Sequence, residues 1–102
     1  MQWSPETLLT AAIANCYLLT FRAVSGAALF GWLRLECRVE GVLEPVDRRP
    51  RFSRFETLAT LTVAAGADAA KAKRLLKKAD RDCLIANSLR GPRTFACRVV
   101  AL

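Results

Sequence analysis

The spacing of hydrophobic residues divides this chain into helices and strands. Ser4-Pro5-Glu6 is typical of a helix start, with serine as the N-cap, proline in the first turn and an acid near the positive end of the helix dipole. Four residues continue at helical spacing: Leu9, Ile13, Cys16 and Thr20. Because apolar residues surround this segment on nearly every side, the pattern predicts a central, buried helix that ends or bends at Ser25-Gly26.

The hydrophobic period then changes to two. Apolar and charged residues alternate over residues 32–44, which predicts a strand with one buried and one solvated face. A loop is expected at residues 45–50, and a second strand over residues 52–63. These strands are expected to form an antiparallel pair with a long connection. Alternation over residues 95–101 predicts a last strand.

A strongly basic helix separates the second strand from the last one. Gly66-Ala67-Asp68 caps this helix, and a short helical segment is expected at residues 84–89. The apolar stripe of the basic helix consists of Ala72, Leu76, Ala79 and Cys83. The order α-β-β-α-β predicts a single α+β domain, residues 1–102, with a small antiparallel sheet and the two helices packed on one face.

Composition narrows the classes of function. A chain of 102 residues holds one domain, and a hydrophobic content of 53% leaves apolar surface that we expect a second copy to cover in a homodimer. Histidine is absent, which excludes Ser/His and Cys/His catalysis and histidine-ligated metal sites. The four cysteines show no CxxC spacing, so we expect no metal and no other cofactor.

The apolar run at the start of the chain is too short to predict a membrane span. It has 14 residues, from Leu8 to Phe21, before Arg22 interrupts it, whereas a spanning helix needs roughly 20. No basic segment precedes it, which disfavours a secretory signal. We therefore expect a cytoplasmic protein without a membrane partner, in a compartment where thiols stay reduced and disulfides are mostly transient.

The net charge of +7 raises the alternative of phosphate binding. Lysines and arginines cover the second helix and recur at residues 48–54. However, no aromatic residues interleave with them and no recognition motif is present, so we do not favour nucleic-acid binding. We assign four aromatic residues to the core, a dimer interface or an apolar pocket: Trp3, Phe21, Phe30 and Trp32.

The cysteines are the groups with the most obvious chemistry. Cys16 and Cys83 each lie on the buried face of a separate helix, which indicates a dithiol that cycles between reduced and disulfide forms. Inert, space-filling thiols are the alternative interpretation. We favour that alternative for Cys37 and Cys97, because both lie on the apolar faces of strands.

Two motifs resemble the OsmC/Ohr family of thiol peroxidases, which act on organic hydroperoxides. The first motif is Ser4-Pro5-Glu6-x-Leu8-Leu9-x-Ala11-Ala12-x-Ala14-x-Cys16. The second is Ala79-Asp80-x-x-Cys83-x-Ile85-x-Asn87-Ser88-Leu89. They occur in the family's order, with two strands between them and one strand after, so the resemblance covers nearly the whole chain.

The resemblance implies a role for three residues. Cys16 is expected to be the peroxidatic thiolate that becomes a sulfenic acid, and Cys83 the resolving thiol that joins it in a disulfide, later reduced by a dithiol. Glu6 matches the acid that positions an activating arginine. It lies ten helical residues from Cys16, a rise of about 15 Å, so it has to act through an intermediary or the partner chain.

The resemblance also implies an assembly and a substrate. The family forms an intertwined homodimer with helices at its centre and active sites at the subunit boundary. An apolar pocket beside Cys16 suits an alkyl or lipid hydroperoxide, and the implied role is defence against oxidative stress.

The chain departs from the family pattern at its N-terminus. Family members carry a sheet and the activating arginine before the Ser-Pro-Glu motif, whereas this sequence starts three residues before Ser4, so we expect an OsmC-like fold lacking that sheet. An unassisted cysteine has a pKa of roughly 8.5, so another cation has to replace the arginine. Arg90 and Arg93 are the first candidates, and Arg22 is a candidate from the partner chain.

Two further hypotheses come from different classes of protein. One is a non-catalytic OsmC-like dimeric domain that keeps the fold without the chemistry. The other, which we favour less, is a basic nucleic-acid-binding module.

Overall fold

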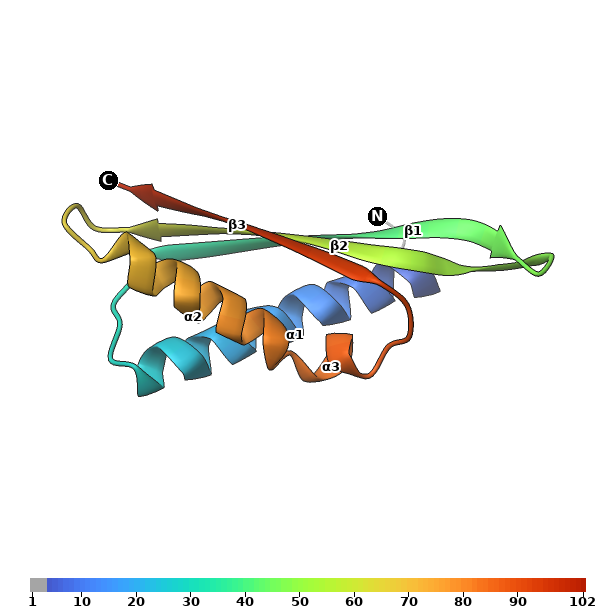
Figure 1. Ribbon diagram of the computed structural model, residues 1–102, viewed down its shortest axis with the longest axis horizontal. Helices are drawn as coiled ribbons and strands as arrows, with labels where there is room; N and C mark the ends of the chain where they lie inside the picture. The colour runs from blue at the N-terminus through green and yellow to red at the C-terminus, as the bar shows by residue number, and fades with distance from the viewer. Residues whose placement is uncertain (1–3) are drawn as a thin grey trace.

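A three-stranded sheet with helices on one of its faces makes up the molecule (Figure 1). The computed structural model describes residues 4–102. The elements follow in the order α1 (Pro5–Ala27), β1 (Arg34–Val46), β2 (Arg49–Val63), α2 (Ala69–Arg81), α3 (Leu84–Asn87) and β3 (Arg93–Ala101). The predicted α+β class, the element order and the packing of helices on one face are confirmed, and α3 is the expected short helical segment.

The direction of β3 differs from the prediction. The strands lie in the order β1-β2-β3, and β1 pairs with β2 in antiparallel fashion as expected. β3, however, runs parallel to β2, with Phe55 opposite Arg93 and Val63 opposite Ala101, so the sheet is mixed rather than antiparallel. The reason is the crossover through α2 and α3, which returns the chain to the end of the sheet where β2 begins, as in a βαβ unit.

The connection between β1 and β2 is a tight hairpin, so the prediction of a long loop at residues 45–50 was wrong. Pro45 pairs with Pro50, and only Asp47 and Arg48 lie between the strands. Both have positive φ, 53° and 65°, the left-handed conformation that a two-residue hairpin turn requires at its two central positions. Proline and arginine in this stretch indicated a turn, but not how short it is.

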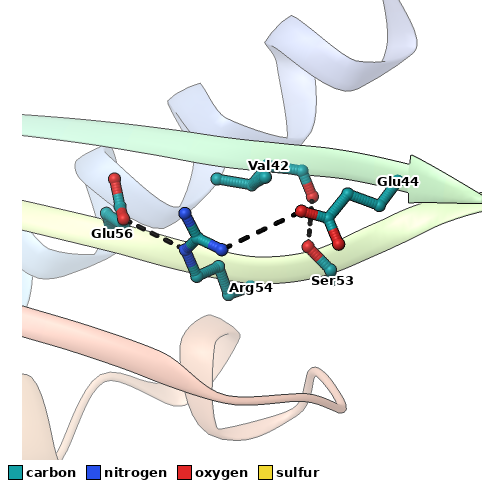
Figure 2. Close-up of polar contacts among 5 residues, drawn as sticks. All are labelled: Val42, Glu44, Ser53, Arg54 and Glu56. Atoms are coloured by element: carbon teal, nitrogen blue, oxygen red, sulfur yellow. Dashed lines mark hydrogen bonds and ion pairs between the residues drawn. The ribbon is translucent and has the colours of Figure 1, made fainter.

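A β-bulge bends this hairpin near its middle (Figure 2). The register shifts between Val42 and Leu43, which leaves Ser53 without a partner in the ladder. The Ser53 hydroxyl donates to the carbonyl oxygen of Val42 at 3.2 Å. Beside it, Arg54 lies 3.1 Å from Glu56 and 4.0 Å from Glu44. These ion pairs are half-exposed, so they add little to stability.

The core lies between the sheet and the helices. Its largest fully buried side chains include Tyr17, Phe21 and Leu76. The Phe21 ring meets the Trp32 ring edge-on at 5.5 Å, and Trp32 Nε1 donates to the Ser25 hydroxyl at 2.9 Å, which anchors the end of α1. Phe21, Phe30 and Trp32 thus belong to the core region as expected, and Trp3 lies outside the described residues.

Helix α1 is less buried within one chain than its sequence predicted. Ser4 caps it by accepting from the amide of Thr7 at 3.1 Å. Its buried residues lie on one stripe, Ile13, Tyr17, Phe21 and Ser25, while Leu8 and Leu19 on other faces are more than half exposed. The helix is long and apolar enough to cross a membrane by length and composition alone, but its inner stripe is part of the core.

Candidate active site

The two cysteines of interest come from elements that pack against each other. Cys16 lies in the middle of α1, partly buried. Cys83 is buried and forms the N-cap of α3, because α2 ends at Arg81 with Asp82 as its C-cap. Cys83 therefore lies between α2 and α3. It was expected on the apolar stripe of α2, but α2 ends before it.

The surroundings of Cys16 favour its thiolate. Burial opposes ionisation, but hydrogen bonds from the backbone of Ile85, the thiol of Cys83, the hydroxyl of Thr20 and the backbone of Leu84 outweigh it, so the pKa of the Cys16 thiol is lowered. Hydrogen bonds to a charged form are the standard way to stabilise it without a neighbouring cation. The amides of Leu84 and Ile85 are free to donate because they belong to the first turn of α3.

The surroundings of Cys83 favour the protonated form. Burial raises the pKa of the Cys83 thiol, and so do its hydrogen bond to Cys16 and the negative charge there. The backbone of Ala86 and the charge of Arg93 act in the opposite direction but do not prevail. The pKa values of the two thiols are thus shifted in opposite directions, and each thiol contributes to the shift of the other.

Thr20 contributes less to this arrangement than its position suggests. Its hydroxyl donates to the carbonyl oxygen of Cys16 at 2.7 Å, whereas its oxygen lies 4.0 Å from the sulfur of Cys16. A hydroxyl has one proton to donate, and the shorter bond uses it. The backbone of α3 and the Cys83 thiol are therefore the main groups that stabilise a thiolate at Cys16.

Arg93 is the arginine that lies nearest to this chemistry among the three candidates. Its Nη2 donates to the carbonyl oxygen of Asp80 at 3.0 Å and to Oδ1 of Asn87 at 2.7 Å. Its charge lowers the pKa of the Cys83 thiol, although burial outweighs this effect. Arg93 therefore lies beside the resolving candidate, and the lowered pKa of Cys16 has other causes.

The remaining predicted residues are not brought to the sulfurs within one chain. Arg90 and Arg22 are exposed, in the segment after α3 and near the end of α1 respectively. Glu6 is also exposed, in the first turn of α1, ten residues from Cys16 along a continuous helix. This separation corresponds to about 15 Å, as the sequence predicted.

Sequence reasoning missed the backbone of Leu84 and Ile85 and the side chain of Asn87. Backbone amides carry no side-chain signature, so the pattern gave no reason to select them. The only available signal was the short helical segment after Cys83, because the first amides of any helix lack an intrahelical partner.

The apolar hollow near Cys16 is too small for a substrate in a single chain. It begins at Ile13, one turn from Cys16, and continues along Phe55, Ala86 and Leu89. Its volume is about 10 Å³, room for roughly one water molecule.

The other two cysteines flank Ala59 on neighbouring strands. Cys37 is opposite Ala59 on one side and Cys97 on the other. Burial, together with the charges of Cys83 and Asp80, raises the pKa of Cys37 to about 12. Cys37 therefore stays protonated at neutral pH, consistent with a space-filling thiol.

Known proteins resemble this chain in sequence and in fold. The sequence model of the family described as OsmC-like protein matches residues 1–98. A search of curated proteins found no match. Similar solved structures include three bacterial proteins. Each is less than 20% identical to this chain in sequence, so the similarity establishes the fold alone.

The first is an OsmC like protein from Mycoplasma pneumoniae, with a TM-score of 0.84 and 17% identity over 98% of this chain and 74% of that one. The second is the organic hydroperoxide resistance protein OhrB of Bacillus subtilis, with a TM-score of 0.75 and 18% identity over 97% and 71%. The third is an OsmC-like protein of unknown function from Vibrio cholerae, with a TM-score of 0.79 and 16% identity over 91% and 62%. This chain thus spans less than two thirds of the Vibrio protein.

Proposed function

Because the chain belongs to the OsmC-like protein family, we propose that it is a thiol-dependent peroxidase that reduces organic hydroperoxides as a defence against oxidative stress. The observation that carries this proposal is the mutual influence of Cys16 and Cys83 on their ionisation, with the pKa of the first lowered and that of the second raised. Such a pair supplies a nucleophile and a proton donor from two chemically identical side chains. Organic hydroperoxide resistance proteins among the structural relatives support the substrate class.

The first step is attack by the Cys16 thiolate on the terminal oxygen of the hydroperoxide. The O–O bond breaks as the S–O bond forms, and the leaving alkoxide takes a proton to depart as an alcohol. The Cys83 thiol, which keeps its proton because its pKa is raised, is the proton source that we propose for this step. Cys16 is then a sulfenic acid and the peroxide has gained two electrons.

The second step forms the disulfide. The thiolate of Cys83 attacks the sulfur of the Cys16 sulfenic acid, the S–O bond breaks as the S–S bond forms, and the hydroxide that leaves takes a proton from solvent to become water. Loss of the Cys83 proton in the first step prepares this attack. An external dithiol then exchanges with the disulfide, returns both thiols and becomes oxidised itself.

We also propose a single-domain chain that assembles as a homodimer. Leu8 and Leu19 on α1 and Leu84 on α3 are 55%, 56% and 70% exposed, on the helix layer that carries the thiols. Burial of such side chains against a second copy is favourable, and it would also enclose the open side of Cys16. Sedimentation equilibrium tests this: Leu19→Glu is expected to give a monomer, and a monomeric native chain contradicts the proposal.

We propose a cytoplasmic location, because the reaction cycle needs reduced thiols and a supply of dithiol. The four cysteines are free thiols, and the buried stripe of α1 packs against the core of the domain rather than standing apart from it. A reducing compartment supplies the dithiol that the cycle consumes.

A count of free thiols tests the peroxidase directly. One equivalent of tert-butyl hydroperoxide is expected to remove two of the four thiols from the native chain and none from Cys16→Ser. Cys37→Ser is the matched control, because it should still lose two. An unchanged thiol count in a folded native chain supports the non-catalytic domain instead.

The arrangement of basic residues gives less support to nucleic-acid binding. Figure 1 places the turn between β1 and β2, near Arg48 and Arg49, at the opposite end of the molecule from the start of α2. The basic turn and the start of the basic helix therefore lie at separate ends of the molecule, whereas a phosphate backbone would favour one connected basic surface. A salt-sensitive mobility shift of nucleic acid at physiological ionic strength is the result that would reinstate this hypothesis.

A further inference from the structure

Arg93 connects the elements that carry and surround the resolving thiol. From the start of β3, its Nη2 donates to the carbonyl oxygen of Asp80 in α2 at 3.0 Å and to Oδ1 of Asn87, the last residue of α3, at 2.7 Å. The side-chain amide of Asn87 in turn donates to the carbonyl oxygen of Arg81 at 2.8 Å. These hydrogen bonds tie β3, α2 and α3 together around Cys83.

Helix α3 needs such an external support. It has four residues and no side-chain cap at its N-terminus, and its first residue, Leu84, is 70% exposed. A single helical turn has no stability of its own in water. Only Asp82 and Cys83 separate it from α2, so its orientation depends on what its side chains contact.

We propose that Arg93 is a positioning residue, which through Asn87 holds α3 in the orientation that turns the backbone of Leu84 and Ile85 toward the sulfur of Cys16. The inference rests on the proposed function for its catalytic meaning. The structural part of the inference is that Arg93 and Asn87 form a clamp on which the surroundings of Cys16 depend. This part holds whether or not the chain reduces peroxides.

The clamp differs from a direct electrostatic role of the same residue. The charge of Arg93 lowers the pKa of the Cys83 thiol, but it is not among the causes of the lowered pKa of Cys16. The Nη2 of Arg93 is instead committed to two oxygens on two different helices. The planar, multiply donating guanidinium suits this bridging, which a lysine ammonium does not reproduce.

Alkylation of Cys16 by iodoacetamide, followed across pH and resolved for each cysteine by peptide mass spectrometry, tests the proposal. Arg93→Gln and Asn87→Ala are each expected to raise the midpoint of Cys16 alkylation by about one pH unit, which lowers its thiolate fraction at neutral pH up to about tenfold. The double variant should add little to either single change, because both break the same connection. Arg98→Gln, which removes an exposed arginine further along β3, is the matched control and should leave the midpoint unchanged.

Arg93→Lys separates the clamp from the charge. The clamp predicts that this variant shifts the midpoint much as Arg93→Gln does, and a native midpoint in Arg93→Lys overturns the inference. Unchanged midpoints in folded Arg93→Gln and Asn87→Ala overturn it too, with far-UV circular dichroism as the check on folding and Asn87→Ala as the variant that leaves Arg93 intact. Because alkylation uses no peroxide, a shifted midpoint supports the clamp even in a chain that reduces no hydroperoxide.

Discussion

The hydroxyl of Tyr17 donates a hydrogen bond to the carbonyl oxygen of Leu76 at 2.9 Å, across 59 positions of the sequence. Tyr17 follows Cys16 directly in α1, and Leu76 lies in α2, seven residues before Cys83. Both side chains are fully buried. This bond therefore holds α1, which carries Cys16, against α2, which ends two residues before Cys83.

Tyr17→Phe removes this bond while keeping the ring in place. Because the Leu76 carbonyl can keep its place in the hydrogen-bond ladder of α2, we expect a loss of about 1 kcal/mol in the free energy of unfolding. Denaturant midpoints measure this loss, and Tyr17→Ala, which also removes the ring from the core, should cost about 3–5 kcal/mol. A Tyr17→Phe chain as stable as the native one would mean that packing alone holds α1 against α2.

Replacing Cys83 separates its two roles in the reaction. Cys83→Ser keeps a hydrogen-bond donor beside Cys16 but cannot form the disulfide, so it should reduce one equivalent of hydroperoxide at close to the native rate and then stop as a sulfenic acid. Cys83→Ala also stops after one equivalent, but more slowly, because the donor that lowers the pKa of Cys16 is gone. Rapid mixing with tert-butyl hydroperoxide and trapping of the sulfenic acid by dimedone give both numbers.

Turnover by Cys83→Ser in the presence of a dithiol would contradict the resolving role. Equal single-turnover rates in the serine and alanine variants would contradict the donor role alone. The resolving role and the donor role of Cys83 are thus tested by different measurements.

The sequence predicted the positions of the thiols better than the means of their activation. The Ser4 cap and the helical spacing after it located Cys16 correctly, since caps and periodicity are local properties. The parallel pairing of β3 depends on the crossover rather than on the strand itself, and alternation cannot reveal strand direction. Backbone amides carry no side-chain signature, so the sequence indicates a cation instead of these donors.

Alkaline pH should destabilise the fold, because buried acids keep their protons in it. Burial raises the pKa of Cys37 to about 12 from an ordinary value of 9.0, and burial also raises that of Tyr17. Above about pH 9 the unfolded chain releases a proton that the folded chain retains, so this stability is complete below that pH and declines as the pH rises toward 12. The denaturant midpoint, measured under nitrogen, should therefore fall steadily over this range.

Cys37→Ala tests whether Cys37 is responsible for the loss of stability at alkaline pH. The variant leaves a small cavity and is less stable at every pH, so the slope of the midpoint against pH is the informative quantity. A shallower slope than that of the native chain is expected. An identical slope would place the alkaline sensitivity elsewhere in the core.

Gly41 is required by the aromatic contact at the bend of the hairpin. A Cβ at this position would overlap the ring of Phe52, which itself packs on Phe55 with ring centroids 4.8 Å apart. Gly41→Ala should therefore displace the Phe52 ring and cost about 1–3 kcal/mol, as overpacking typically does. Gly26→Ala is the matched control: its new methyl group meets no atom within 4 Å, and alanine in a helix is favoured over glycine by up to about 1 kcal/mol. Chemical denaturation of the two variants should move the midpoint in opposite directions, and a Gly41→Ala chain at least as stable as the native one would show that the Phe52 ring turns aside without loss.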